Sequence, residues 1–203
     1  VNGFVGARLV RNCVIDRYFN DAFPGCLMVV NTTVKNATGG VAANGHPYHS
    51  DVWQERTPMT AENVILYGIT AVENCNQQGI FSRTDGHRDI AIVNCAFDLR
   101  GYPNQSQWRT RSNHMLVQNN TFLGAPFCLG VSDTAATVSG ILGSKSTAFR
   151  NNVFQWVNLD DPRHLAGSGY PTYEAIRDSV QFDNNHFINL WPAGSGPSSG
   201  QGI

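Results

Sequence analysis

The chain is poor in charged residues and has no long apolar run. Charged residues make up 14% of its 203 residues, and the formal net charge is −1. It contains no basic stripe with interleaved aromatic residues, so nucleic acid is not an expected partner. No stretch reaches about 18 consecutive apolar residues, so no membrane-spanning helix is expected. The first residues also lack the pattern of a secretory signal peptide.

Cysteine is scarce and follows no metal-binding pattern. The count of five is odd, so at least one thiol is unpaired or bonded to another chain. No Cys/His spacing typical of zinc is present, and no metal ligands are assigned. Cys13 and Cys95 each follow an Asn in a repeated pattern, which predicts small buried residues in a stack. Cys26, Cys75 and Cys128 lie elsewhere in the chain, and a disulfide among these three stays open.

One short pattern recurs seven times along the chain. It reads apolar, any residue, Asn, small or polar, any residue, apolar, and Gly68 replaces Asn in the third copy. The copies lie at 10–15, 29–34, 66–71, 92–97, 117–122, 149–154 and 182–187. From Asn94 onward the Asn positions are 25 (119−94), 32 (151−119) and 33 (184−151) residues apart. A variable period of this size without helical spacing predicts stacked coils.

Each copy has the composition of a short β-run on either side of a bend. Its apolar residues suit a pleated, buried surface, and Asn tolerates the left-handed backbone angles of a turn. One unit cannot bury its apolar side alone, but stacked units share a core and pair their edges. Asn side chains in register would add hydrogen bonds between layers. A β-sandwich would need recurrent tight hairpins, which are few, so a parallel β-helix is predicted.

Two copies, Asn119-Asn120-Thr121-Phe122 and Asn151-Asn152-Val153-Phe154, carry a resemblance to a known group. They look like the right-handed parallel β-helix repeats of the pectate-lyase-like superfamily, and the resemblance covers roughly residues 8–190. That superfamily contains lyases, hydrolases, epimerases, phage tailspikes and non-catalytic binders. The resemblance therefore implies an all-β solenoid fold but not one activity.

The repeat spacing predicts one domain over residues 1–190, a solenoid of about eight coils. Residues 191–203 are rich in Gly, Ser and Pro and are expected to form a flexible or linker-like tail. Val1 opens almost directly into a coil, without an amphipathic capping helix. Solenoids usually need a cap, so a second copy or a neighbouring domain is expected to cover an open end.

Polar and aromatic residues cluster in runs between the copies, at 49–54, 79–85, 107–111 and 128–133, each about one coil after the last. If Val52 and Ile80 point inward, alternation along the strands turns the intervening residues outward. Stacking would gather these groups on one outer surface. The predicted catalytic residues are His49, Asp51, Arg83 and Asp85, and the predicted substrate-binding residues are Trp53, His87, Trp108, Arg109 and Arg111.

This combination of residues suits an acidic polysaccharide. Arg pairs with carboxylates, aromatic rings suit sugar faces, and a solenoid offers an elongated groove. In β-elimination or epimerisation, Arg83, Arg109 or Arg111 would neutralise the uronate carboxylate, and His49 or His87 would take the ring proton. Hydrolysis would use Asp51 and Asp85 as acid and base, but no clustered Asp pair occurs there. The absence of Lys near these runs weakens the lyase assignment.

Simpler explanations stay open for the same residues. His49 can bond loop backbone, Asp51 and Asp85 can form ion pairs with arginines, and Trp53 and Trp108 can be partly buried. No cofactor is certain; Ca²⁺ held by Asp is one candidate, and a transition ion held by His is another. We expect a secreted or surface-exposed protein that acts on an acidic polysaccharide. The alternative is a non-catalytic surface, virion or filament module that binds glycan or self-assembles.

Overall fold

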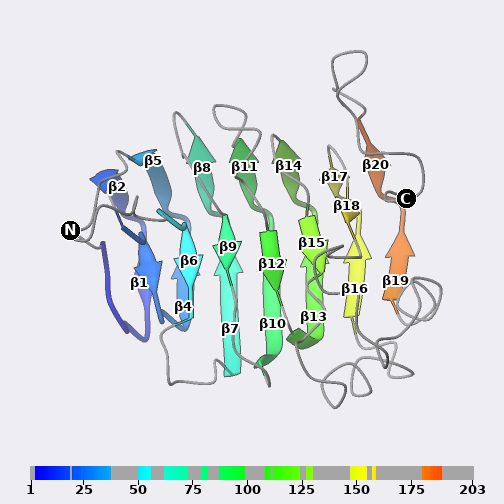
Figure 1. The fold of residues 1–203 in the computed structure, drawn as a ribbon, viewed down its shortest axis with the longest axis horizontal. Helices are drawn as coiled ribbons and strands as arrows, with labels where there is room; N and C mark the ends of the chain where they lie inside the picture. The colour runs from blue at the N-terminus through cyan, green and yellow to red at the C-terminus, as the bar shows by residue number, and fades with distance from the viewer. Residues whose placement is uncertain are drawn as a thin grey trace, which may run out of the picture.

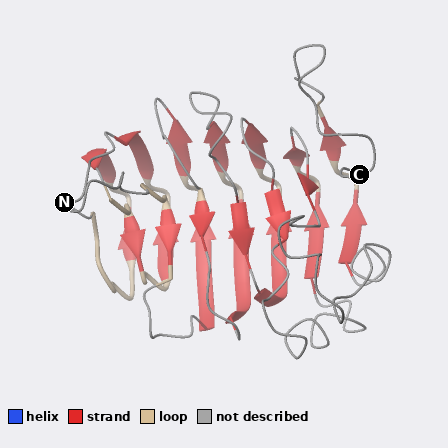
Figure 2. Ribbon diagram, in the orientation of Figure 1, coloured by secondary structure: helices blue, strands red, loops and turns tan. Residues whose placement is uncertain are grey.

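The computed structural model describes most of the repeated segments of the chain. The described residues are 3–18, 20–37, 50–55, 62–72, 79–81, 87–98, 108–110, 112–123, 127–129, 147–154, 157–158 and 180–188. Within these ranges all regular structure is β-strand, and no helix long and apolar enough to cross a membrane occurs. The strands stack side by side in rows along the molecule (Figures 1 and 2).

Three parallel sheets form the faces of the solenoid, and we name them A, B and C. Sheet A joins β1 (Val10–Arg11), β4 (Met28–Val30), β7 (Glu62–Tyr67), β10 (His87–Val93), β13 (Ser112–Gln118), β16 (Thr147–Arg150) and β19 (Val180–Asp183). Sheet B joins β2 (Val14–Tyr18), β5 (Thr33–Ala37), β8 (Thr70–Val72), β11 (Ala96–Asp98), β14 (Thr121–Leu123), β17 (Val153–Phe154) and β20 (His186–Phe187). Sheet C joins β3 (Phe23–Pro24), β6 (Trp53–Gln54), β9 (Ile80–Phe81), β12 (Trp108–Thr110), β15 (Phe127–Leu129) and β18 (Val157–Asn158).

The chain visits the sheets in a fixed rotation, and each strand pairs in parallel with the strand one rotation away. In sheet A, for example, Ile92 aligns with Leu66 on one side and with Val117 on the other. In sheet B, Phe97 aligns with Ala71 and Phe122. This topology confirms the predicted all-β, parallel, stacked architecture.

Each repeated pattern is the corner between sheets A and B. The template Asn residues from Asn12 to Asn184 have φ between 47° and 56°, and Gly68, in the third copy, has φ of 63°. These values lie in the left-handed region, which Asn and Gly tolerate better than other residues. The predicted role of Asn as the residue that turns the chain is therefore confirmed.

The main ladder of side-chain hydrogen bonds is formed by the residue after the template Asn. Asn120, Asn152 and Asn185 stack there, and Asn120 and Asn152 are almost fully buried. Asn120 Nδ2 donates to Asn152 Oδ1 at 3.0 Å, and Asn152 Nδ2 donates to Asn185 Oδ1 at 2.8 Å. The exposed template residues contribute one described rung, from Asn119 Nδ2 to Asn94 Oδ1 at 3.2 Å. The predicted ladder exists, but its buried part lies one residue later than expected.

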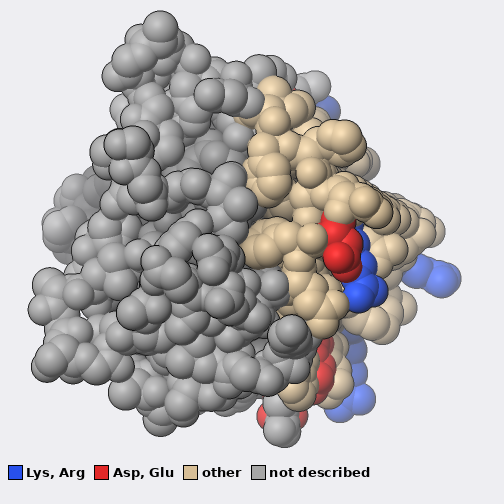
Figure 3. Space-filling model, turned by 90° about the vertical axis from the view of Figure 1, so that its right-hand side faces the viewer, with Lys and Arg blue, Asp and Glu red and all other residues tan. Residues whose placement is uncertain are grey.

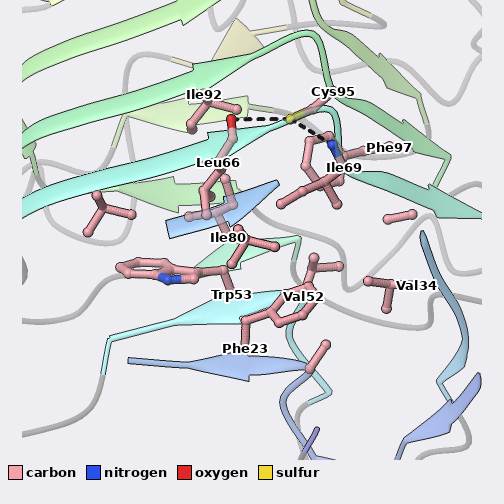
Figure 4. Close-up of a cluster of buried hydrophobic side chains, with 14 of the residues drawn as sticks. Phe23, Val34, Val52, Trp53, Leu66, Ile69, Ile80, Ile92, Cys95 and Phe97 are labelled. Carbon is pink, nitrogen blue, oxygen red and sulfur yellow. Dashed lines mark hydrogen bonds between the residues drawn. The ribbon is translucent and has the colours of Figure 1, made fainter. Parts of the chain in front are cut away.

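Cys95 occupies the buried ladder position one coil before Asn120. Its thiol donates to the carbonyl oxygen of Leu66 at 3.5 Å and accepts from the backbone N–H of Ile69 at 3.4 Å (Figure 4). Burial raises the pKa of this thiol to about 12. The burial predicted for both cysteines is confirmed for Cys95, whereas Cys13 is only partly buried.

Inward side chains of the three sheets make a continuous core. In sheet B the rings of Phe97, Phe122, Phe154 and Phe187 form a column, with successive centroids 5.4, 5.1 and 5.9 Å apart. Phe23, Trp53 and Ile80 from sheet C belong to the same core cluster as Phe97 (Figure 4). Since one coil cannot bury these side chains alone, the stack itself holds the fold together.

Candidate functional sites on the solenoid

Sheet C brings together the runs that the sequence marked as functional. Strands β6, β9, β12 and β15 are consecutive neighbours, as the one-coil spacing predicted. Gln54 aligns with Phe81, which aligns with Arg109, and Arg109 aligns with Cys128. Residues of four predicted runs therefore form a single row across the strands of this sheet.

The expected outward direction of Asp51 and Trp53 is wrong. Trp53 is 1% exposed, and its indole Nε1 donates to the carbonyl oxygen of Cys26 at 2.8 Å. Asp51 is 0% exposed. Val52, which was expected to be the inward residue of this run, is buried as well. Strict alternation fails because β6 contains only Trp53 and Gln54, so the residues before it follow a corner rather than a pleated strand.

Asp51 lies next to another buried carboxylate, on the neighbouring coil. The backbone N–H of Asp51 donates to Oδ1 of Asp21 at 3.2 Å, and Asp21 is itself buried. Burial raises the pKa of the Asp21 carboxyl to about 6, although this hydrogen bond opposes the shift. A carboxylate held inside this corner cannot reach a polymer on the outer surface. The described contacts of Asp51 are therefore those of a structural residue.

The remaining predicted site residues lie partly or wholly beyond the described part of the chain. His49, Arg83, Asp85 and Arg111 fall outside the described residues. His87 begins β10, and Trp108 and Arg109 begin β12, but only their backbone positions are described. Their predicted roles stay predictions.

Sheet A carries a pair of functional groups that sequence reasoning missed. His114 Nδ1 lies 3.3 Å from Asp89 Oδ1, on strands β13 and β10. The side chains are 57% and 46% exposed, so the pair is open to solvent. The signal was present in the spacing, because 114−89 equals 25, the same separation as that between Asn94 and Asn119. Residues at that separation in this segment stack in adjacent coils.

A shallow depression of about 290 Å³ opens beside the pair. Asp89 and His114 line it together with Ala91, Leu116 and Ala148, which align across three strands of sheet A. The depression therefore has a small, apolar floor and a polar edge. A depression with an apolar floor and a polar edge suits a ligand that has an apolar face and hydroxyl groups at its rim.

Two pairs of charged or polar groups elsewhere on the described surface are bonded locally. On sheet A, Arg150 Nε lies 3.1 Å from Asp183 Oδ2. On sheet B, Asn36 Nδ2 donates to Asp16 Oδ1 at 2.9 Å, and this bond, aided by Lys35, holds the pKa of Asp16 below its usual value. The end view in Figure 3 shows acidic and basic side chains next to each other on the described face, without a field of one sign. Among the described residues, no group of three or more His, Cys, Asp and Glu could hold a metal ion.

Comparison with family models, with curated proteins and with solved structures finds no match for this chain.

Proposed function

We propose that the chain is a right-handed parallel β-helix of the pectate-lyase-like kind, with about eight coils. It acts on an acidic polysaccharide by β-elimination or C5-epimerisation, outside the cell or on a surface. The polymer lies across the strands of sheet C and meets one coil after another. The observation that carries this proposal is the row formed by Gln54, Phe81 and Arg109, which joins three predicted runs on adjacent strands.

The proposed chemistry requires a cation and a base at the uronate. A guanidinium of Arg83, Arg109 or Arg111 would pair with the uronate carboxylate and stabilise the negative charge that develops when C5 loses its proton. Of the two predicted bases, His49 would take that proton, because His87 begins β10 of sheet A rather than a strand of sheet C. In elimination the electron pair forms the C4–C5 double bond as the glycosidic oxygen leaves C4 and is protonated. In epimerisation a proton returns to the opposite face of C5.

Asp51 has no part in this scheme, because its side chain is fully buried and its backbone N–H is bonded to Asp21. Asp85 would position the base or contact substrate hydroxyls. Ca²⁺ is the ion that would best neutralise a second uronate carboxylate. Its contribution can be tested by chelation.

The burial of Asp51 and Trp53 favours a second candidate, a non-catalytic surface, virion or filament module that binds glycan or self-assembles. These two residues belonged to the predicted catalytic and binding set, but Trp53 bonds the Cys26 carbonyl oxygen and Asp51 bonds Asp21, contacts that serve the fold. A module without turnover would keep the same stacked row as a binding surface. The two candidates differ in whether bound polymer is changed.

The experiment compares binding and turnover for the native chain, Arg109→Ala and Arg11→Ala. Arg11 is an exposed arginine on sheet A, so it controls for loss of one surface charge. We expect Arg109→Ala to lose binding or turnover on acidic polysaccharides while Arg11→Ala keeps both. Equal behaviour of the two variants would contradict the sheet C groove. Binding without any change in the polymer would select the non-catalytic module.

A further inference from the structure

The Asp89–His114 pair stands at an irregular backbone position that recurs from coil to coil. Asn63, Asp89 and His114 have φ of 58°, 60° and 54°. In the pairing of β10 with β7, Arg88 aligns with Glu62 and Ile90 aligns with Val64. Asp89, which lies between them, is left out of the regular strand pairing. Ladder pairing with β13 skips Asp89 and His114 in the same way. The three residues thus form a stacked column of left-handed positions, in register on neighbouring strands.

The residues of this column differ in the functional group that they carry. Asn63 fills the position in the first of the three strands, and Asp89 and His114 fill it in the next two. Asn, Asp and His are among the residues most often found at left-handed angles, so all three suit the backbone. The change of residue type along the column places a carboxylate and an imidazole 3.3 Å apart at the edge of the depression.

We propose that Asp89, His114 and the adjacent depression form a second binding site, on sheet A, for an uncharged sugar chain. The apolar floor of Ala91, Leu116 and Ala148 would accept the C–H face of a pyranose ring. The carboxylate of Asp89 would accept hydrogen bonds from ring hydroxyls, and His114 would donate or accept at the next ring. This site is independent of the groove proposed on sheet C.

Charge and size narrow the ligand class. The carboxylate of Asp89 would repel a uronate, so the site suits neutral rather than acidic sugars. Ala91 and Ala148 are two strand spacings apart in sheet A, roughly 10 Å. That distance matches about two sugar rings laid along the solenoid axis. An equatorially linked neutral chain, such as β-1,4-linked glucose, presents flat apolar faces of this kind.

The test uses Asp89→Asn and His114→Asn, which copy the residue found at position 63. Both substitutions suit the backbone, so the thermal unfolding temperature should stay the same or rise. Asp16→Asn, an exposed carboxylate on sheet B, is the matched control. The probes are a tetramer of β-1,4-linked glucose and a tetramer of galacturonate, and binding is measured by calorimetry and by the NMR signal of the His114 ring.

The native chain should bind the glucose tetramer and shift the His114 signal. Asp89→Asn and His114→Asn should each weaken binding by roughly tenfold, as for loss of one hydrogen bond to a charged group. Asp16→Asn should bind like the native chain. The proposal is overturned if the native chain does not bind the glucose tetramer, if both Asn variants bind it unchanged, or if the His114 signal responds only to galacturonate. Arg109→Ala, which should lose galacturonate turnover, should still bind the glucose tetramer. The two proposals can therefore fail separately.

Discussion

Asn152 offers a sharp test of what holds the coils together. It is 0% exposed, and its side chain takes part in four hydrogen bonds. Nδ2 donates to the Val117 carbonyl oxygen at 2.9 Å and to Asn185 Oδ1 at 2.8 Å. Oδ1 accepts from the backbone N–H and from Nδ2 of Asn120, both at 3.0 Å. One side chain therefore connects three successive coils.

Replacing Asn152 with Ala would leave two buried backbone groups without this partner, the N–H of Asn120 and the carbonyl of Val117. The amide of Asn120 would keep its bond to the Ile92 carbonyl oxygen, and Asn185 Oδ1 would keep the backbone N–H of Asn152. Each buried group left without a partner costs about 1–3 kcal/mol, so the loss of two should lower the free energy of unfolding by roughly 2–6 kcal/mol. That is a large fraction of the ~5–15 kcal/mol typical of a folded domain.

The adjacent residue, Asn151, supplies the matched control. It is exposed, with φ of 53°. Asn151→Ala should cost only about 1–2 kcal/mol, because Ala tolerates the left-handed region poorly. Asn151→Gly should be close to neutral. Urea unfolding followed by circular dichroism gives the free energies. Similar losses for Asn151→Ala and Asn152→Ala would refute the buried ladder as the main tie between coils.

Three further predictions concern the core and the buried acid. Phe122→Ala should lower the free energy of unfolding by about 3–5 kcal/mol, because it leaves a cavity in the middle of a column of stacked rings. Phe122→Leu should lower it by less, and urea unfolding measures both variants. Because burial raises the Asp21 pKa from 3.8 to about 6, protonation favours the folded state, so stability should fall as pH rises from below 4 through about 6. Asp21→Asn should flatten that part of the unfolding-against-pH profile, and an unchanged profile would contradict the assignment. In the native state iodoacetamide should modify Cys13 faster than Cys95, because Cys95 is buried and its pKa is raised to about 12. Mass spectrometry of the digested protein measures the labelling of each cysteine, and equal labelling would contradict the buried position of Cys95.

The stacked fold could be predicted because its signal repeats. A bend at Asn94 or Asn119 recurs at a similar place in every coil, and burial of the flanking apolar residues needs the same register each time. The runs that form sheet C could also be placed on adjacent strands, because their spacing follows that of the bends. The preference of one Asn for a bend is weak, but its repetition in successive coils is enough to predict the stacked fold.

The candidate sites could be predicted less well, because side-chain direction depends on local backbone detail. The two-residue strand β6 is too short to fix which side Asp51 faces, and Trp53 faces inward to satisfy its indole N–H. Asp89 and His114 both adopt left-handed backbone angles, at matching places on neighbouring strands. Such a position interrupts the regular pleat, so a pattern based on strict alternation misses the pair, whereas the separation of 25 residues indicates it.

The measurement that tests the central functional claim most directly is the ultraviolet absorbance of unsaturated uronates. It would be followed over a panel of acidic polysaccharides, with Ca²⁺ and with a chelator, and C5-epimerisation would be followed in the same samples by NMR. We expect a change in at least one polymer that is lost in Arg109→Ala and kept in Arg11→Ala. No binding and no change in any acidic polymer would contradict it.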